Sequence, residues 1–369
     1  METINPVEIG RKKFQAGFQE RLSVLQQQVE ALKERIEGRL RACEEDVDWA
    51  AWGSPPEELF DLRVRRVLEG HRARVYALDW SADNVSLASA SIDGKVIVWD
   101  AYTRTKRGLA VLESPWIMTT AFDRESGSNL LVGGVDTCIT VFDVEKLLAL
   151  PASPAPTRPA CILEGHTGYV TSAAFLTTER IISGSGDGTL GLWDTRINQL
   201  LAKYADHGKD VTAVAAHPHD PFMAASASAD KSLRLWDLRA REEHACVRIF
   251  TGFRSEATDV EIFRNGFTIA GCSADSTLRL FDMRSTAPLG TYTDLSIKNG
   301  ASALSVSASG GLVVVAYERN EAVAWEITSS DGTFHELVGH SARVSCLAVN
   351  PVGQALAMGS WDKRVTIWC

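Results

Sequence analysis

Histidines and aspartates recur together in this sequence, and such a pair can act as a general base with its orienting carboxylate. Gly-His pairs stand at Gly70-His71, Gly165-His166 and Gly339-His340, with a looser copy at Asp206-His207. Each histidine is followed further along by an aspartate, namely Asp93, Asp187, Asp362 and Asp230 respectively. An active site would occur once, whereas this combination repeats along the chain. The pairs therefore indicate repeated structural hydrogen bonds, and no catalytic residue is predicted.

Other chemical signals are weak. His217, Pro218, His219 and Asp220 could suggest a metal site, but they occupy a predicted turn and no further ligand cluster of zinc-type spacing accompanies them. No phosphate-binding loop of the form Gly-x-x-x-x-Gly-Lys-Ser/Thr occurs. We therefore expect no metal, no cofactor and no enzymatic activity.

A seven-residue phrase runs through the chain: an aspartate, apolar residues three and five positions later, and Trp or Phe at the sixth position. It occurs at Asp93 to Trp99, Asp136 to Phe142, Asp187 to Trp193, Asp230 to Trp236, Asp275 to Phe281 and Asp362 to Trp368. Trp325 stands where another copy is due, with Arg319 in the aspartate position. The closing aromatics are about 43 to 51 residues apart, a period typical of a stacked array or propeller.

Each phrase predicts a strand preceded by a turn, because its apolar residues alternate with the period of β structure. The aromatic falls on the opposite face, so both faces need cover, as in a blade wedged between two others. Serines two residues before the aspartates, including Ser91 and Ser185, would join His, Ser, Asp and Trp in one buried hydrogen-bonded row. The predicted blade network comprises His71, Ser91, Asp93, Trp99, His166, Ser185, Asp187, Trp193, Asp230, Trp236, His340, Asp362 and Trp368.

These repeats resemble the WD40 family, with Trp-Asp at Trp99-Asp100, Trp193-Asp194 and Trp236-Asp237. The fold expected is all-β: a seven-bladed WD40 β-propeller over residues 63–369, with an N-terminal α-helical coiled-coil extension. The chain stops one strand short of a complete last blade, while residues 63–68 have no local partner. We expect this segment to supply the outer strand of the last blade and to close the ring.

The N-terminal region differs from the repeats. Apolar residues follow one another at spacings of three and four: Phe18, Leu22, Leu25, Val29, Leu32 and Ile36. This a/d stripe predicts a coiled-coil helix within residues 1–45 that pairs with a partner helix, and the alternative is packing against the side of the propeller. Residues 46–62 form a connector, which is compatible with a short second helix at Glu57 to Phe60.

Composition limits the partners. The formal net charge of -9 argues against binding nucleic acid. Seven cysteines without a Cys-x-x-Cys pair indicate a reduced, cytoplasmic protein, and no apolar run is long enough for a membrane span. Cys369 is the last residue, which excludes a C-terminal prenylation box. Four prolines in residues 150–159 predict a surface loop, for which we favour a tolerated insertion over a binding role.

Local phrases give a narrower resemblance. Leu68-Glu69-Gly70-His71, Trp116-Ile117-Met118-Thr119, Gly165-His166-Thr167-Gly168-Tyr169 and Gly359-Ser360-Trp361-Asp362 resemble the β subunits of heterotrimeric G proteins, as does the heptad helix leading into the ring. The resemblance implies a surface that binds the GDP-loaded α subunit and competing effectors. It would comprise Arg74, Tyr76, Trp116, Met118, Val135, Thr137, Tyr169, Asp210, Thr212, Glu256 and Trp361.

The same resemblance implies that the stripe from Phe18 to Ile36 pairs with a γ subunit, and that lipids on the partners hold the complex at the inner face of the plasma membrane. Several residues depart from the family pattern: Val135, Thr212, Phe253, Thr258, Ala274 and Arg319. The alternative functions are a generic WD40 scaffold that dimerises through its coiled coil and, from another class, a propeller enzyme.

Overall fold

The computed structural model describes residues 62–149, 157–293, 299–327 and 334–369. The chain divides into two compact units, Met1–Leu59 and Phe60–Cys369, and only the second contains described residues. The predicted coiled-coil stripe from Phe18 to Ile36, the connector up to residue 61 and most of the proline-rich loop lie outside the described residues.

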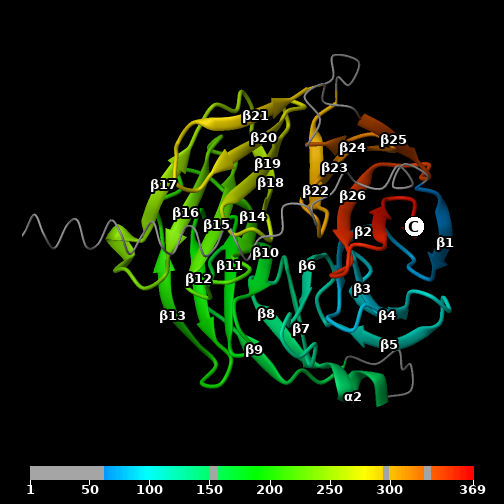
Figure 1. Cartoon of the computed structure of the whole chain (residues 1–369). Coiled ribbons are helices and arrows are strands. Elements are labelled where there is room, and N and C mark those ends of the chain that lie inside the picture. The colour runs from blue at the N-terminus through cyan, green and yellow to red at the C-terminus, as the bar shows by residue number, and fades with distance from the viewer. Residues whose placement is uncertain (1–61, 150–156, 294–298, 328–333) are drawn as a thin grey trace, which may run out of the picture. The chain divides into compact units, whose positions relative to one another are not determined.

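The second unit is a ring of seven four-stranded sheets, which we call blades 1 to 7 (Figure 1). Blade 1 comprises β2 (Val75–Trp80), β3 (Ser86–Ser91), β4 (Lys95–Asp100) and β5 (Lys106–Val111). Blade 2 comprises β6 (Ile117–Phe122), β7 (Asn129–Gly134), β8 (Ile139–Asp143) and β9 (Cys161–Leu163). Blade 3 comprises β10 (Val170–Phe175), β11 (Arg180–Ser185), β12 (Leu190–Asp194) and β13 (Gln199–Tyr204). Blade 4 comprises β14 (Val211–Ala216), β15 (Met223–Ser228), β16 (Leu233–Asp237) and β17 (Cys246–Phe250).

Blade 5 comprises β18 (Ala257–Ile262), β19 (Thr268–Ser273), β20 (Leu278–Asp282) and β21 (Pro288–Tyr292). Blade 6 comprises β22 (Ala301–Val306), β23 (Leu312–Tyr317), β24 (Glu321–Glu326) and β25 (Phe334–Val338). Blade 7 comprises β26 (Val344–Val349), β27 (Leu356–Ser360), β28 (Arg364–Trp368) and β1 (Val64–Glu69). The helix α2 (Val144–Ala149) follows β8, and a 3-10 turn η2 (Glu242–His244) precedes β17. The first strand of each blade faces the centre of the ring, and the fourth lies at its circumference (Figure 1).

The core lies between neighbouring blades. Val96 and Val98 of β4 pack in one cluster with Phe122 and Phe142 of blade 2, so the apolar alternation of one blade buries itself against the next. The aromatics Trp99, Trp193 and Trp236 are completely buried on the other face. Burial on both faces is what the two-sided apolar pattern of the repeated phrase predicts.

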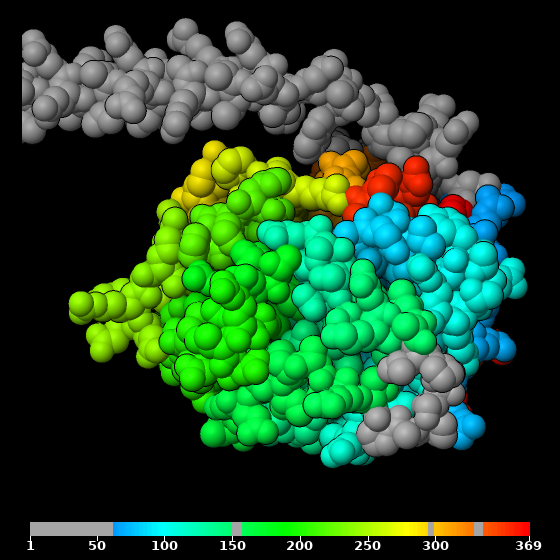
Figure 2. Space-filling view, turned by 90° about the horizontal axis from the view of Figure 1, so that it is seen from below, coloured from blue at the N-terminus to red at the C-terminus, as the bar shows by residue number. Residues whose placement is uncertain are grey.

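The ring is closed by strand β1. It pairs antiparallel with β28, with Val67 opposite Thr366 and Leu68 opposite Val365. This is the pairing expected for residues 63–68. Figure 2 shows the first described residues, in blue, beside the last, in red. Inside the ring Ser345 Oγ donates to Val75 O at 2.5 Å, which joins blade 7 to blade 1.

The buried networks contain a different serine from the one predicted. In blade 1, His71 Nε2 lies 2.7 Å from Ser89 Oγ, which also accepts from Trp99 Nε1 at 2.7 Å. His71 Nδ1 faces Asp93 at 3.6 Å. Ser91 accepts instead from the backbone N–H of Asp93 at 3.3 Å.

The same arrangement recurs in three other blades. Ser183 links His166 to Trp193, and Ser226 links His207 to Trp236. In blade 7, Thr366 links His340 to Trp368. The prediction that Ser91 and Ser185 join the row was therefore wrong: these serines cap the turn that holds the aspartate.

Candidate protein-binding rim

The predicted surface residues gather at one mouth of the central channel. All seven first strands run through the channel in the same direction, so the residue before each strand lies at this mouth. These seven residues are Arg74, Trp116, Tyr169, Asp210, Glu256, Gly300 and Arg343. Each of their carbonyls accepts a backbone N–H from a residue that follows the blade's second strand, namely Ile92, Val135, Gly186, Ala229, Ala274, Glu318 and Trp361. We call these fourteen residues the rim.

Seven of the eleven predicted residues belong to the rim. They are Arg74, Trp116, Val135, Tyr169, Asp210, Glu256 and Trp361. Tyr76, Met118 and Thr212 are the second residues of β2, β6 and β14, directly inside the mouth, and Thr137 lies in the turn after Val135. The structure thus brings together all eleven residues, which come from blades 1 to 5 and blade 7.

Trp116 is the most prominent side chain of the rim. Its φ of +70° is a left-handed conformation that non-glycine residues rarely adopt, and its side chain is 51% exposed. The carbonyl oxygen of Trp116 accepts from Val135 N at 3.3 Å. A Cβ on Gly134, the residue before Val135, would lie only 2.3 Å from the same oxygen. Glycine at position 134 is therefore required by this close approach. Val135 is also exposed, at 48%, so blade 2 presents apolar surface.

Trp361 is half-buried beneath two arginines. The guanidinium of Arg74 lies 4.1 Å from its ring centroid and that of Arg343 lies 5.1 Å away. The Tyr76 ring is 6.0 Å from it. Such stacked cations are attracted by the indole face. The surface offered here is thus two guanidinium groups fixed by a tryptophan.

Arg343 was missed in the sequence. It occupies in blade 7 the position that Arg74 occupies in blade 1, and Nη1 of Arg343 lies 3.5 Å from Glu318 of blade 6. Aligning the repeats around their first strands would have found it, because Arg343-Val344-Ser345 parallels Arg74-Val75-Tyr76.

An acidic group occupies the other side of the mouth. The Tyr169 hydroxyl donates to Asp210 Oδ2 at 2.6 Å. This bond, followed by burial and by the charges of Asp210 and Glu256, raises the pKa of Tyr169 above its ordinary value. Glu256 is exposed. The rim is therefore polarised, with Arg74 and Arg343 over blades 1 and 7 and two carboxylates over blades 4 and 5.

Two departures from the family pattern, Thr212 and Thr258, make side-chain contacts inside the ring. Thr212 Oγ1 donates to Ala257 O at 2.7 Å and so links blade 4 to blade 5. The hydroxyl of Thr258 lies 3.2 Å from Cys272 Sγ. At Ala274 only the backbone makes the contact: a Cβ on Gly300 would lie 3.0 Å from Ala274 Cα, so the close approach constrains Gly300.

The histidines of the weak metal hypothesis lie at the opposite mouth. His217 and His219 hydrogen-bond to the backbone oxygens of Gly266 and Arg264. No group of three or more metal-ligating side chains occurs among the described residues. Within that same part of the chain, no helix is both long and apolar enough to cross a bilayer.

The closed ring and its repeated His–Ser–Trp bonds define a WD40 β-propeller. A family model described as G protein beta WD-40 repeat protein matches residues 19–369, so the chain belongs to that family. It is 32% identical to a guanine nucleotide-binding protein subunit beta of Zea mays, over 96% of this chain and 97% of that protein. It is 35% identical to guanine nucleotide-binding protein G(I)/G(S)/G(T) subunit beta-1 of Homarus americanus, over 94% of this chain and 99% of that one.

Proposed function

We propose that this chain is the β subunit of a heterotrimeric guanine-nucleotide-binding protein and acts by binding proteins, without catalysis, through the rim. The observation that carries the proposal is the convergence of Trp116, Val135 and the Arg74–Trp361–Arg343 stack on one mouth of the channel. Exposed aromatic and arginine side chains of this kind are typical of protein-binding hot spots. Family membership supports the choice of partner.

The proposed mechanism is the masking of one surface. A GDP-loaded α subunit would cover the rim, and its reordering with GTP would lower its affinity and free the same residues for effectors. The propeller itself need not change shape, since the blades are tied to one another by hydrogen bonds such as Thr212 to Ala257.

The polarity of the rim would orient the α subunit. Its contacting segment would place acidic groups over Arg74 and Arg343 and basic groups over Asp210 and Glu256. Complementary charges of this kind chiefly raise the association rate and fix the register of a complex.

The N-terminal stripe would pair with a γ subunit. The proposed contacts are Phe18, Leu22, Leu25, Val29, Leu32 and Ile36. Replacing Leu25 and Leu32 by Asp should abolish co-purification of γ, because charges in an a/d seam break the pairing, whereas exchanging the polar Gln26 and Gln27 for Glu should preserve it. Survival of the pair after the Leu25 and Leu32 changes would contradict this contact.

A lipid on γ would give a peripheral attachment to the plasma membrane. One lipid chain binds a membrane only marginally, so a second signal, such as a lipid on α, would be needed.

The test is a pull-down of this chain, co-expressed with a γ subunit, from its native lysate, first with GDP and then with a non-hydrolysable GTP analogue. An α subunit retained with GDP and released by the analogue is the expected result. Retention of the same unrelated proteins with either nucleotide would favour the scaffold alternative and overturn the proposal.

A further inference from the structure

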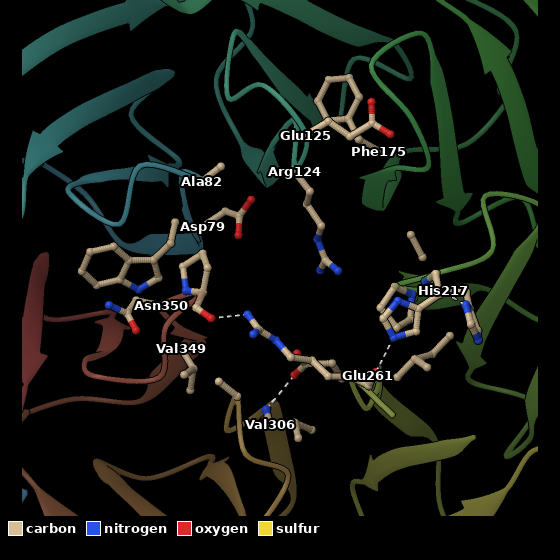
Figure 3. Close-up of a pocket in the computed structure, with 18 of the residues that line it drawn as sticks. Asp79, Ala82, Arg124, Glu125, Phe175, His217, Glu261, Val306, Val349 and Asn350 are labelled. Atoms are coloured by element: carbon tan, nitrogen blue, oxygen red, sulfur yellow. Dashed lines mark hydrogen bonds between the residues drawn. The ribbon is translucent and has the colours of Figure 1, made fainter. Parts of the chain in front are cut away.

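The channel mouth opposite the rim contains a cavity of about 550 Å³ (Figure 3). It lies where the first strands end and is lined by residues of all seven blades, including Asp79, Arg124, Leu176, His217, Glu261 and Arg264. A cavity of this size is typical of a small-molecule site. The rim and the proposed partner contacts lie at the other mouth, so this cavity has no part in them.

One wall of the cavity is rigidly built from interlocked loops. The N–H groups of His219 and Asp220 both donate to His217 Nδ1, so His217 Nε2 carries the proton and donates to Gly266 O at 3.0 Å. His219 Nε2 donates to Arg264 O at 2.6 Å. The Arg264 side chain in turn donates to Pro351 O. These bonds join blades 4, 5 and 7 and hold the Arg264 guanidinium at the cavity.

Arg124 faces this wall from blade 2. Its guanidinium extends into the cavity (Figure 3), and no hydrogen bond or ion pair ends on it within the described part of the chain. The cavity therefore presents two guanidinium groups from different blades, one unpaired and one with donors remaining. Planar guanidinium forks bind phosphate oxygens in pairs.

Carboxyl groups complete the lining. Asp79 Oδ2 accepts from Phe122 N at 2.7 Å, and Glu261 Oε2 accepts from Val306 N at 2.8 Å. Each carboxyl thus uses one oxygen to join its blade to a neighbour. The second oxygen of Glu261 remains for a ligand, and Asp79, which also meets the backbone N–H of Trp80, keeps lone pairs that can accept. A hydroxyl group is the donor that suits both. A free metal cation suits the cavity poorly, because Arg124 and Arg264 would repel it.

We propose that this cavity binds a small phosphate monoester that carries hydroxyl groups, with the phosphate on Arg124 and Arg264 and the hydroxyls on Asp79 and Glu261. Both recognition elements are needed, since the guanidinium groups select the phosphate and the carboxyls select against a bare anion. Binding at this cavity does not depend on the identity of the partners at the rim.

The test is calorimetric titration of the full-length chain, with any subunit that co-purifies, using glucose 6-phosphate as the probe. Saturable binding is expected, at least tenfold tighter than for inorganic phosphate and for glucose. Arg124→Ala should weaken it at least tenfold, and Arg124→Lys should do so partly, because lysine keeps the charge but loses the fork.

Two control variants make the result specific. Arg241→Ala removes an exposed arginine at another place, and Trp116→Ala alters only the rim; both should leave probe binding unchanged. Circular dichroism should show that the Arg124 variants remain folded. Absence of binding by the folded parent, equal affinity for inorganic phosphate, or full binding by Arg124→Ala would each overturn the proposal. Loss of α-subunit binding in Trp116→Ala with intact probe binding would separate the two sites.

Discussion

One left-handed residue gives the rim its most exposed aromatic side chain. For an L-residue such a backbone conformation costs roughly 1 to 2 kcal/mol, which the surrounding blade must offset. At Trp116 the offsetting contacts include the bond from Val135 N and the space left by Gly134. A strained residue whose side chain then points into solvent indicates a role outside the fold.

Trp116→Ala should therefore weaken α-subunit binding by about 2 kcal/mol or more, as expected of a hot-spot residue. The thermal midpoint should stay nearly unchanged, because the side chain is half exposed. Calorimetry against GDP-loaded α subunit measures the first effect and thermal unfolding the second. Tyr102→Ala, at an exposed turn of blade 1, is the matched control. An unchanged affinity in Trp116→Ala would reject this residue as a contact.

Three carboxyls near the opposite mouth give a pH-dependent stability. Burial raises the pKa of Glu261 from 4.5 to about 7, and the pKa of both Asp79 and Asp259 to about 6. The folded state therefore binds more protons than the unfolded state between about pH 4 and pH 7. Their contribution to the free energy of unfolding falls as the pH rises through this window.

Glu261→Gln should remove part of this effect, while Gln Oε1 can still accept from Val306 N. The free energy of unfolding of the variant minus that of the parent should be larger at pH 8 than at pH 4.5, by about 1 to 3 kcal/mol. Arg124, Asp79 and Asp259 act on the same carboxyl and stay unchanged. Thermal unfolding at both pH values checks this expectation, and an equal difference at the two values would contradict it.

At the scale of the element, the blades differ in how firmly the repeated aspartate is held. Burial opposes ionisation of Asp187, but bonds from Thr189, Thr167 and Lys203 outweigh it and lower its pKa. In blade 2, Glu113 stands three residues before the rim residue Trp116, at the position where blade 1 has His71 before Arg74. Asp136 Oδ1 is buried without a hydrogen-bond partner among the described residues.

Asp187→Ala should therefore destabilise the protein by about 1 to 3 kcal/mol, because it leaves buried donors unsatisfied. Asp136→Ala should cost less than about 1 kcal/mol, since the lost carboxylate has fewer bonds to lose. Urea unfolding at pH 7 compares them, with similar dependence on denaturant required of both. Equal losses of free energy of unfolding from the two variants would show that Asp136 in blade 2 is held as firmly as Asp187 in blade 3.

The elements were largely predictable and some of their contacts were not. The phrase ending in Trp99 specified a strand, its period and its burial, because side-chain alternation is local. The choice between Ser89 and Ser91 was not available, since residues two apart share one face of β3 and only the register decides which reaches Trp99. Arg343 was missed because the repeated phrase does not include it, and its stacking on Trp361 follows only from the pairing of β26 with β27.

At the scale of the whole molecule, the ring depends on one strand from the other end of the chain. Leu68 of β1 is buried in a cluster that also contains Val75, Val365 and Ile367, so it packs against blades 1 and 7 together. Strand β1 therefore stabilises the seam as well as filling an edge.

Leu68→Ala should lower the free energy of unfolding by about 2 to 5 kcal/mol through the cavity it leaves at this seam. Val64→Ala, on the exposed side of the same strand, should cost less than about 1 kcal/mol. Thermal and urea unfolding of both variants provide the measurement. Similar losses from the two variants would show that the seam does not depend on the buried face of β1.

The pairing of β1 with β28 also sets a time order for biosynthesis. Val67 emerges from the ribosome about 300 residues before its partner Thr366, which at about 5 to 20 residues per second is a delay of roughly 15 to 60 s. The seventh blade can form only after Trp368 has been added, so until then β1 lacks the strand with which it pairs. Until then β1 keeps an unpaired edge that is open to pairing with another chain, so the nascent protein is most prone to aggregate before its last strand is made.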